Sequence, residues 1–255
     1  MKRVVFNQKG GVGKSTIVCN LAAIAADSGR SAAVVDLDPQ ANSTQYLLGD
    51  EWRQSETNLA RFFEKTLSFR VGGNDPAEYC LETPFPDLWV MPASPELTEL
   101  EGKLEAKHKI YKLKEALDVL AEEVDEVYVD TPPAFNFFTF SALIGCDRCL
   151  IPFDCDDFSR RALYNLLENV AEVRADHNPE LEVEGIVVNQ FQARSNLPQR
   201  VVAELREEKL PVLDQMISSS VIVKESHQAN RPLIHLKRSH KVTQEFVALY
   251  ESLSG

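Results

Sequence analysis

The sequence has few long hydrophobic runs. Only three apolar residues, 4–6, precede Asn7 at the N-terminus, so the chain shows no hydrophobic region of a secretory signal. The most apolar helical stretch, residues 17–26, is interrupted by Asn20 and is shorter than the ~20 residues that a membrane span requires. We therefore expect a cytoplasmic protein with neither a targeting segment nor a transmembrane segment.

Cysteine is also scarce. The five cysteines are irregularly spaced, and an odd number in a chain without a signal indicates thiols in a reducing compartment rather than a disulfide framework. Cys146 and Cys149 form a CxxC pair, but no second pair or cluster of histidines completes a zinc site. We interpret the cysteines as small buried or edge side chains.

Positive charge is the third deficit. The 255 residues carry 27 Lys and Arg against 39 Asp and Glu, a formal net charge of −12. Spread over the whole surface, this charge repels phosphate backbones and anionic lipids, which argues against indiscriminate adhesion to nucleic acid or membranes. Hydrophobic and charged contents of 44% and 26% are ordinary for a globular chain and exclude disordered, collagen-like and coiled-coil classes.

Short apolar runs alternate with helix-period segments, which predicts a doubly wound, mostly parallel α/β sheet flanked by helices. The expected strands are residues 4–7, 31–36, 88–92, 126–130, 149–153 and 183–190. The expected helices are residues 15–27, 57–69, one or two within 95–124, 159–176, 197–209, 221–229 and 239–253. Residues 37–85 are otherwise rich in turn signals. Because no repeat or linker interrupts the pattern, we expect residues 1–255 to form a single domain.

A glycine-rich turn lies between the first expected strand and the first expected helix. Its glycines allow successive backbone N–H groups to point inward, and the start of the helix adds a positive field, which together predict a phosphate-binding P-loop. Lys14 can neutralise the β- and γ-phosphates of a nucleotide, and the Ser15 hydroxyl can ligate Mg²⁺. The expected contacts in this segment are Lys9, Gly10, Gly11, Val12, Gly13, Lys14, Ser15 and Thr16.

Acidic residues end two of the expected strands. Asp36 and Asp38 follow the second strand, and Asp130 ends the fourth. Ligands of open α/β sheets bind outside the carboxyl ends of the strands, so these carboxylates lie where a nucleotide would meet them. A carboxylate near the γ-phosphate can orient or deprotonate a water. The acids of residues 154–157 also follow a strand, and we interpret them as the N-terminal cap and first turn of the next helix.

The loop departs from the general pattern G-x-x-x-x-G-K-[ST]. Gln8 stands where the first glycine would be, and Lys9 adds a second lysine. Residues 9–15 resemble the shared K-G-G-x-G-K-[ST] of the deviant Walker-A ATPases of the ParA and MinD class. Residues 36–42 and the Asp-Thr-Pro-Pro of residues 130–133 resemble further segments of this family, in the same order along the chain.

The resemblance implies an Mg²⁺-dependent ATPase that forms a homodimer with ATP sandwiched between its subunits. In this family the first lysine, here Lys9, reaches the partner's nucleotide, and the second acid, here Asp38, acts on the attacking water. The catalytic residues implied are Lys9, Lys14 and Asp38.

The resemblance also implies the cofactors ATP and Mg²⁺. Ser15 would contact the ion directly and Asp130 through a bound water. Asn189 ends the late strand whose terminal polar residue contacts adenine in this family, and an amide suits the donor and acceptor edge of a purine. The alternative interpretation of Asn189 is a turn residue at a strand end.

The C-terminal region distinguishes branches of the class. MinD-like members end in a basic amphipathic membrane-binding helix, whereas here no basic residue follows Lys241, so we expect the last helix to pack on the domain. Iron-protein relatives hold a shared Fe–S cluster on paired cysteines, and the CxxC pair lacks that context.

Residues 191–241 carry nine basic and five acidic side chains, a net charge of +4 that leaves −16 for the rest of the chain. A dimer doubles this basic face, which predicts nonspecific DNA binding. Residues 218–220 are all serine, where partition members often carry an arginine. The candidate DNA contacts are Arg194, Lys224, Lys237 and Arg238.

We therefore expect an ATP-driven switch that binds DNA nonspecifically, is associated with the nucleoid in its ATP state, and positions or segregates DNA or another cargo. A partner protein would stimulate hydrolysis and release the dimer. One alternative is a switch that docks on a protein or membrane-bound assembly without binding DNA. Another is a P-loop synthetase acting on a small molecule, whose pocket would be built from residues 50–85.

Overall fold

A single sheet organises the structure, a computed structural model that describes residues 1–68, 73–155 and 159–254. Across these residues seven strands pair in the order β3-β4-β2-β5-β1-β6-β7. All neighbours are parallel except β3 and β4, which are antiparallel. The strands are β1 (Lys2–Val5), β2 (Ala32–Asp36), β3 (Leu81–Glu82), β4 (Leu88–Met91), β5 (Glu126–Asp130), β6 (Arg148–Asp154) and β7 (Glu182–Asn189). The expected doubly wound α/β fold is confirmed.

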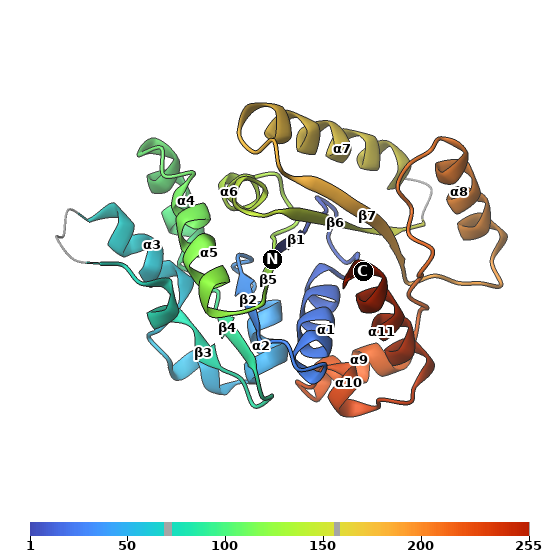
Figure 1. Cartoon of the computed structure of the whole chain (residues 1–255), viewed down its shortest axis with the longest axis horizontal. Coiled ribbons are helices and arrows are strands. Elements are labelled where there is room, and N and C mark those ends of the chain that lie inside the picture. Colours follow the sequence, from blue (N-terminus) through green and yellow to red (C-terminus); the bar gives the residue numbers. More distant parts are fainter. Residues whose placement is uncertain (69–72, 156–158, 255) are drawn as a thin grey trace.

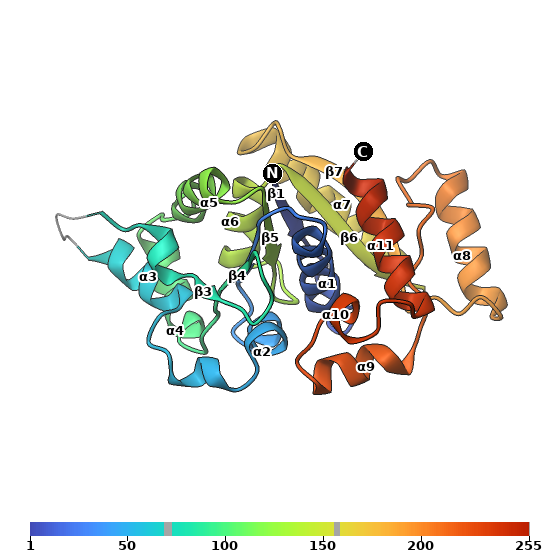
Figure 2. The ribbon, with the colours of Figure 1, turned by 60° about the horizontal axis from the view of Figure 1, so that its bottom comes forward.

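Helices cover both faces of this sheet (Figures 1 and 2). Helices α1, α2, α9, α10 and α11 pack into one apolar cluster, and α3 to α8 pack into the other. Their bounds are α1 (Lys14–Asp27), α2 (Asn42–Leu48), α3 (Leu59–Leu67), α4 (Leu97–Ala106), α5 (Lys112–Glu123), α6 (Phe137–Gly145), α7 (Ser159–Asp176), α8 (Asn196–Glu207), α9 (Val221–Gln228), α10 (Leu233–Leu236) and α11 (Lys241–Ser254). None of the helices in the described ranges has the length and hydropathy needed to cross a membrane.

The central strands and most of α1 are buried, including charged side chains such as Arg3 and Glu126. All residues of β1, β2 and β5 are buried, as expected for parallel strands covered on both faces. In α1, residues 17–26 are buried without interruption, since the sheet lies on one side of the helix and α11 on another. The carboxyl ends of β1, β2 and β5, which are neighbours in the sheet, therefore lie beside the start of α1.

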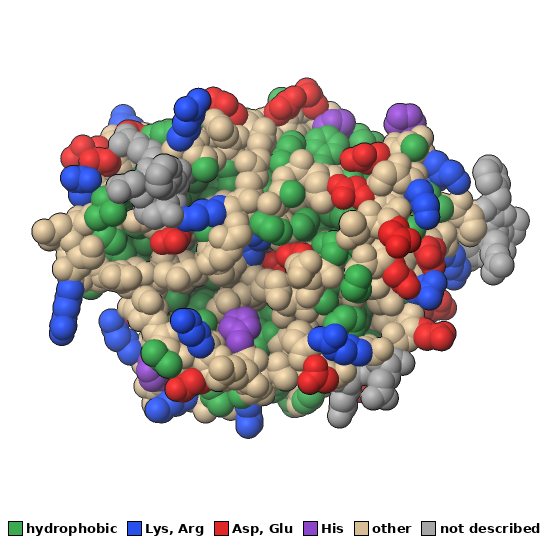
Figure 3. Space-filling view, turned by 180° about the vertical axis from the view of Figure 1, so that it is seen from behind, with side chains coloured by type: hydrophobic (Ala, Val, Ile, Leu, Met, Phe, Trp, Pro, Cys, Tyr) green, Lys and Arg blue, Asp and Glu red, His purple; other side chains and the backbone are tan. Residues whose placement is uncertain are grey.

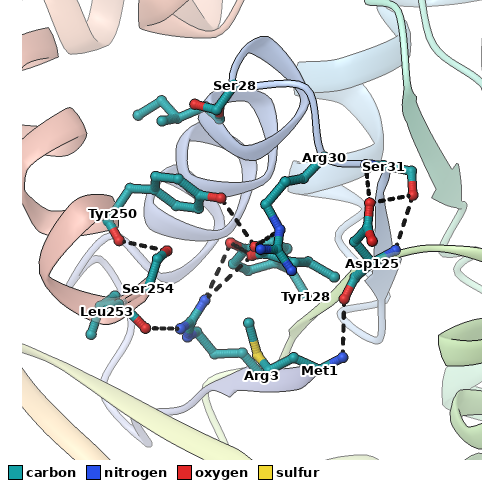
Figure 4. Close-up of polar contacts among 12 residues, drawn as sticks. Met1, Arg3, Ser28, Arg30, Ser31, Asp125, Tyr128, Tyr250, Leu253 and Ser254 are labelled. Atoms are coloured by element: carbon teal, nitrogen blue, oxygen red, sulfur yellow. Dashed lines mark hydrogen bonds and ion pairs between the residues drawn. The ribbon is translucent and has the colours of Figure 1, made fainter.

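The C-terminal helix packs on this core, as the sequence predicted. Its residues Phe246 and Leu249 are fully buried. A polar cluster closes the contact (Figure 4): the Tyr250 hydroxyl donates to Glu126 Oε1 at 3.0 Å, and Arg3 donates to the Leu253 carbonyl at 3.3 Å. The C-terminal helix is thus tied to the first and fifth strands.

The least readable segment, residues 37–85, holds more structure than expected. It contains α2, α3, two short 3-10 turns (Glu51–Gln54 and Pro76–Tyr79) and β3. The helix predicted over residues 57–69 begins at Leu59, where the Asn58 side chain caps it by accepting from the Arg61 N–H, and it ends at Leu67. Phe69 lies outside the described residues. Two further elements, α6 and α10, were absent from the prediction.

Candidate functional site

The glycine-rich loop joins β1 to the N-terminus of α1. Gly11 and Gly13 have φ of +78° and +89°, a region that side chains rarely adopt. A Cβ on Gly13 would also lie 2.2 Å from Asn189 Nδ2. No side chain caps α1, so its first N–H groups are available to an anion beside the positive end of the helix.

A cavity of about 340 Å³ lies over this helix start. Its lining unites the loop with the segment after β2, the loop after β5 and α9. The lining residues are Gly10, Gly11, Gly13, Lys14, Ser15, Thr16, Asp38, Gln40, Asn42, Pro133 and His227. Most of the P-loop residues predicted from the sequence therefore share one cavity, whereas Val12 is buried behind it.

Lys14 is buried at the base of the cavity. Its Nζ donates to the Lys9 carbonyl at 3.0 Å. Burial lowers the pKa of Lys14, and the carboxylates of Asp130 and Asp38 act against that shift. The structure therefore brings Lys14 and Asp38 together in one cavity. An anionic ligand there would further stabilise the charged form of Lys14.

Lys9 lies at the rim rather than in the lining. Its side chain is 34% exposed, and its Nζ is 3.6 Å from Asp154 Oδ2, at the end of β6. Its backbone N–H donates to Asn7 Oδ1 at 2.9 Å, which holds the turn. Asp154, interpreted from the sequence as part of a helix cap, thus pairs with Lys9. The neighbouring Asp156 and Asp157 lie outside the described residues.

The three strand-end acids differ in their surroundings. Asp36 is fully buried, and its Oδ2 accepts hydrogen bonds from the Thr44 N–H at 2.8 Å and the Thr44 hydroxyl at 2.7 Å. It therefore anchors α2 rather than facing the cavity. Asp38 reaches the cavity, and burial raises the pKa of its carboxyl.

Asp130 ends β5 below Ser15. Its Oδ2 accepts a hydrogen bond from the Ser43 hydroxyl at 2.7 Å, and the Ser15 side chain lies near enough to lower the pKa of this carboxyl. Its Oδ1 is buried and has no hydrogen-bond partner among the described residues. Burial raises the pKa of Asp130 to about 6, and the nearby Ser15 and Ser43 side chains oppose the rise.

Ser15 and Asp130 together suit a magnesium ion. A hydroxyl and a carboxylate with an unsatisfied oxygen are the hard ligands that Mg²⁺ prefers. Within the described ranges, no group of three or more His, Cys, Asp or Glu side chains could hold a metal ion. A cation here would therefore complete its shell with water and ligand oxygens, as Mg²⁺ does at phosphates.

Asn189 and the following Gln190 brace the loop from β7. The Asn189 amide donates to the Val12 carbonyl at 2.8 Å, and the Gln190 amide donates to the Gly11 carbonyl at 2.8 Å. The structure thus places Asn189 against the P-loop backbone. Gln190 was not predicted, because its side chain reaches the loop only through a left-handed φ of +55°.

His227 is the second group that the sequence analysis missed. It comes from α9, and a ring nitrogen, Nε2, lies 2.8 Å from Thr16 Oγ1. Burial lowers the pKa of the imidazole. No local pattern announced this residue, because only the packing of α9 against α1 brings it to the cavity.

The four candidate DNA contacts do not form one cluster. Lys224 and Lys237 line a common surface hollow of about 540 Å³, whereas Arg238 forms an ion pair with Asp27 of α1. Arg194 lies before α8, which stands apart from α9 and α10 (Figures 1 and 2). Lys and Arg side chains gather along the lower left of Figure 3, on the side of α9 and α10.

The CxxC pair is buried. Burial raises the pKa of Cys149 to about 12 and that of Cys146 well above its usual value. Both side chains therefore remain protonated thiols at neutral pH and belong to the core beside β6.

Known proteins resemble this chain over nearly its whole length. A family model described as an AAA domain matches residues 2–183. The Chromosome partitioning protein ParA of Myxococcus xanthus is 32% identical over 253 residues, covering 98% of this chain and 86% of that protein. The Sporulation initiation inhibitor protein Soj of Bacillus subtilis is 31% identical over 232 residues, covering 90% and 88%.

A solved structure adds a bound nucleotide to the comparison. Cobyrinic Acid a,c-diamide synthase from Mycobacterium smegmatis, with bound ATP analog and magnesium, is 26% identical with a TM-score of 0.77. The match covers 94% of this chain and 97% of that one.

Proposed function

Since the chain belongs to the ParA family of P-loop ATPases, we propose that it is an ATP-driven switch that dimerises around ATP and positions DNA or another cargo. One observation carries the proposal: Lys14, Ser15 and Asp38 line one cavity with Asp130 beneath it, while Lys9 stands at its rim. Residues 1–255 would act as a single domain.

ATP would bind with its phosphates over the start of α1. The N–H groups of the loop and Lys14 would hold the phosphate oxygens, and Ser15 with Asp130 would hold Mg²⁺. When bound, the ion neutralises charge on the β- and γ-phosphates. The buried, unsatisfied Oδ1 of Asp130 supports this assignment. Asn189 would support the nucleotide from β7, toward its adenine end.

Asp38 would orient the water that attacks the γ-phosphorus and accept its proton. The bond from phosphorus to the β,γ-bridging oxygen then breaks, which gives ADP and phosphate. Burial raises the pKa of Asp38, which favours a carboxylate able to take a proton. Lys14 and the Lys9 of a second copy would balance the charge that develops on the transferred group.

Dimer formation would move Lys9 from one partner to another. In the single chain, Lys9 Nζ lies beside Asp154, at the mouth of the site. Because this pair is partly exposed, it costs little to exchange for a phosphate of the partner's nucleotide. ATP would thus join two copies, and hydrolysis would release them once a partner protein accelerates the step.

DNA would bind to the basic side of the ATP dimer without sequence preference. Lys224 and Lys237 share one hollow beside α9, which supports them as phosphate contacts more directly than Arg194 or Arg238. Two copies double the number of these contacts, while the negative charge elsewhere opposes other adhesion. The ATP-bound dimer would then be found on the nucleoid.

A small-molecule synthetase is the second candidate, since one of the matched structures is a cobyrinic acid diamide synthase. Its substrate pocket would need residues 50–85. A switch docking on a protein assembly instead of DNA is the third.

Retention on DNA separates these functions. Wild-type chain with ATP and Mg²⁺ should be retained on duplexes of unrelated sequence, and retention should fall steeply as salt rises. ADP, or Lys14→Ala with ATP, should abolish it. Lys224→Ala with Lys237→Ala should weaken it, and Lys103→Ala with Lys107→Ala, on the α4 side, is the matched control. Hydrolysis without DNA retention at low salt would contradict the DNA-binding part and favour docking.

A further inference from the structure

Helix α9 lies between the nucleotide cavity and the exterior. Ser226 is fully buried, whereas Val221 at its start is 68% exposed. Lys224, two residues before Ser226 and three before His227, lines the outer hollow together with Lys237. One short helix therefore faces the cavity on one side and the basic surface on the other.

The inner side of α9 contacts two elements of the nucleotide site. The His227 Nε2 is 2.8 Å from the Thr16 hydroxyl in α1, and its ring stacks on Tyr46 in α2, with centroids 4.0 Å apart and planes 20° apart. The Tyr46 hydroxyl lies 2.8 Å from Ser226 Oγ. Because α2 follows the loop that carries Asp38, α9 touches both the P-loop helix and the helix after the acidic loop.

The direction of the hydrogen bond between His227 and Thr16 decides whether the Thr16 hydroxyl hydrogen is free for a ligand. A hydroxyl has a single hydrogen to donate and two lone pairs that can accept hydrogen bonds. If the imidazole N–H donates to Thr16 Oγ1, the hydroxyl hydrogen remains for an acceptor in the cavity, such as a phosphate oxygen. Burial lowers the pKa of His227, which favours the neutral ring with a single N–H at pH 7.

We propose that His227 is a positioning residue of the nucleotide site, which orients the Thr16 hydroxyl toward a phosphate and thereby ties α9 to the occupied P-loop. The inference rests on the nucleotide-binding part of the proposed function. It identifies a histidine outside the P-loop sequence as a determinant of nucleotide affinity. Through Thr16 and His227, a bound nucleotide would also be coupled to α9, the helix that carries Lys224.

Two substitutions separate the hydrogen bond from the packing. His227→Gln retains an amide N–H at a similar reach, whereas His227→Phe retains the aromatic ring on Tyr46 and removes the donor. With the full chain and Mg²⁺, binding of fluorescent ADP and ATP analogues should weaken about five- to tenfold in His227→Phe. His227→Gln should restore most of this loss. Both nucleotides should weaken alike, since they share the α- and β-phosphates that the loop cradles.

Three further readouts test positioning against a structural role. The KM for ATP should rise in His227→Phe while kcat at saturation stays near the wild-type value. The Tm without nucleotide should be no lower in His227→Phe, which keeps the stack on Tyr46, than in His227→Gln. In hydrogen exchange, Mg-ADP should protect the backbone amides of α9 in the wild type and in His227→Gln, and protect them less in His227→Phe.

Two results would overturn this inference but leave the proposed function standing. One is wild-type affinity in His227→Phe. The other is an equal loss of affinity in both variants, together with a lower Tm without nucleotide, since this assigns His227 to the stability of the fold. If the wild-type chain bound neither nucleotide, the proposed function would fail as well.

Discussion

The Ser43 hydroxyl donates a 2.7 Å hydrogen bond to Asp130 Oδ2, which joins the helix after β2 to the carboxylate that ends β5. Both side chains are fully buried. The bond therefore links the two acidic segments of the site, whose strands β2 and β5 are neighbours in the sheet.

Ser43→Ala removes one of the hydrogen bonds that support the charged form of Asp130. We expect unfolding free energy to fall by about 1–3 kcal/mol, because a buried carboxylate loses a partner. Mg²⁺-dependent nucleotide binding should weaken with it. Urea denaturation and nucleotide titration measure the two effects. Ser28→Ala is the control and should leave nucleotide binding unchanged, because the Ser28 hydroxyl donates to the Ile24 carbonyl at the far end of α1.

Asp38→Ala should bind ATP but hydrolyse it at least about 100-fold more slowly, because the general base is lost. Light scattering with ATP and Mg²⁺ should then show a long-lived dimer, whereas the wild-type dimer should decay as ATP is consumed. Asp50→Ala, which replaces an exposed aspartate beyond α2, is the matched control and should hydrolyse normally. A monomer that persists in Asp38→Ala with ATP would contradict the sandwich model.

Lys9 and Asp154 should have opposite effects on the dimer. Lys9→Ala should abolish ATP-dependent dimerisation, because the partner's nucleotide loses its second cation. Asp154→Asn should raise the dimer fraction, by at most about fivefold since a partly exposed ion pair is worth little. Sedimentation at several protein concentrations measures both. An unchanged dimer in Lys9→Ala would remove that lysine from the proposed contact.

Gly13→Ala should disrupt the loop. A side chain there would take a φ of +89° and would meet Asn189 Nδ2 at 2.2 Å, so we expect a loss of about 1–3 kcal/mol and of nucleotide binding. Gly102→Ala is the contrasting control, because nothing lies within 4 Å of its Cβ position in α4. It should gain about 0.5–1 kcal/mol from helix propensity. Equal stability in the two variants would contradict this account.

His235→Phe should stabilise the fold. The ring stacks on Phe85 at 4.6 Å, and its buried Nε2 has no hydrogen-bond partner among the described residues, so removing that nitrogen should gain roughly 1 kcal/mol. Burial lowers the pKa of His235 below its usual 6.5, so the unfolded chain binds its proton first as pH falls.

This residue therefore contributes stability that is present above pH 6.5 and is lost as pH falls toward its folded pKa. Between pH 7 and 5.5, His235→Phe should lose less unfolding free energy than the wild type. The raised pKa values of Asp36 and Asp130 act in the opposite direction, but they are common to both proteins and cancel in the difference. An equal pH dependence would exclude His235 as a source.

The local chemistry of the site was predictable from the sequence. The loop at Lys14 follows from glycines at fixed spacing, and the parallel sheet follows from alternating apolar runs and helices. That Asp38 and Asp130 lie at one edge follows from strand direction alone, since parallel strands end on the same side. The resemblance to the ParA class was likewise carried by local motifs, and it is confirmed.

What the sequence left open depends on contacts between distant segments. The packing of α9 against α1 and α2 places His227 beside Thr16, 211 residues away. Helix α6 was missed because a short apolar run is typical of a buried strand and of a buried helix alike. The run has no polar face that would reveal a helical period. The antiparallel strand β3 has two residues, too few to show the alternation of apolar and polar residues that predicts a strand.

The packing of the last helix, α11, on α1 has a consequence for how the chain folds during its synthesis. The strand β1 pairs with β5 and β6, and α1 is covered by α11, so the N-terminal segment finds its partners only when distant parts of the chain exist. Such long-range pairing slows folding. While the ribosome still holds the C-terminus, the apolar surface of α1 stays uncovered, and chaperones have their longest opportunity to bind there. The lining of the nucleotide cavity is likewise complete only after His227 has been made, 211 residues after Thr16 of its first helix.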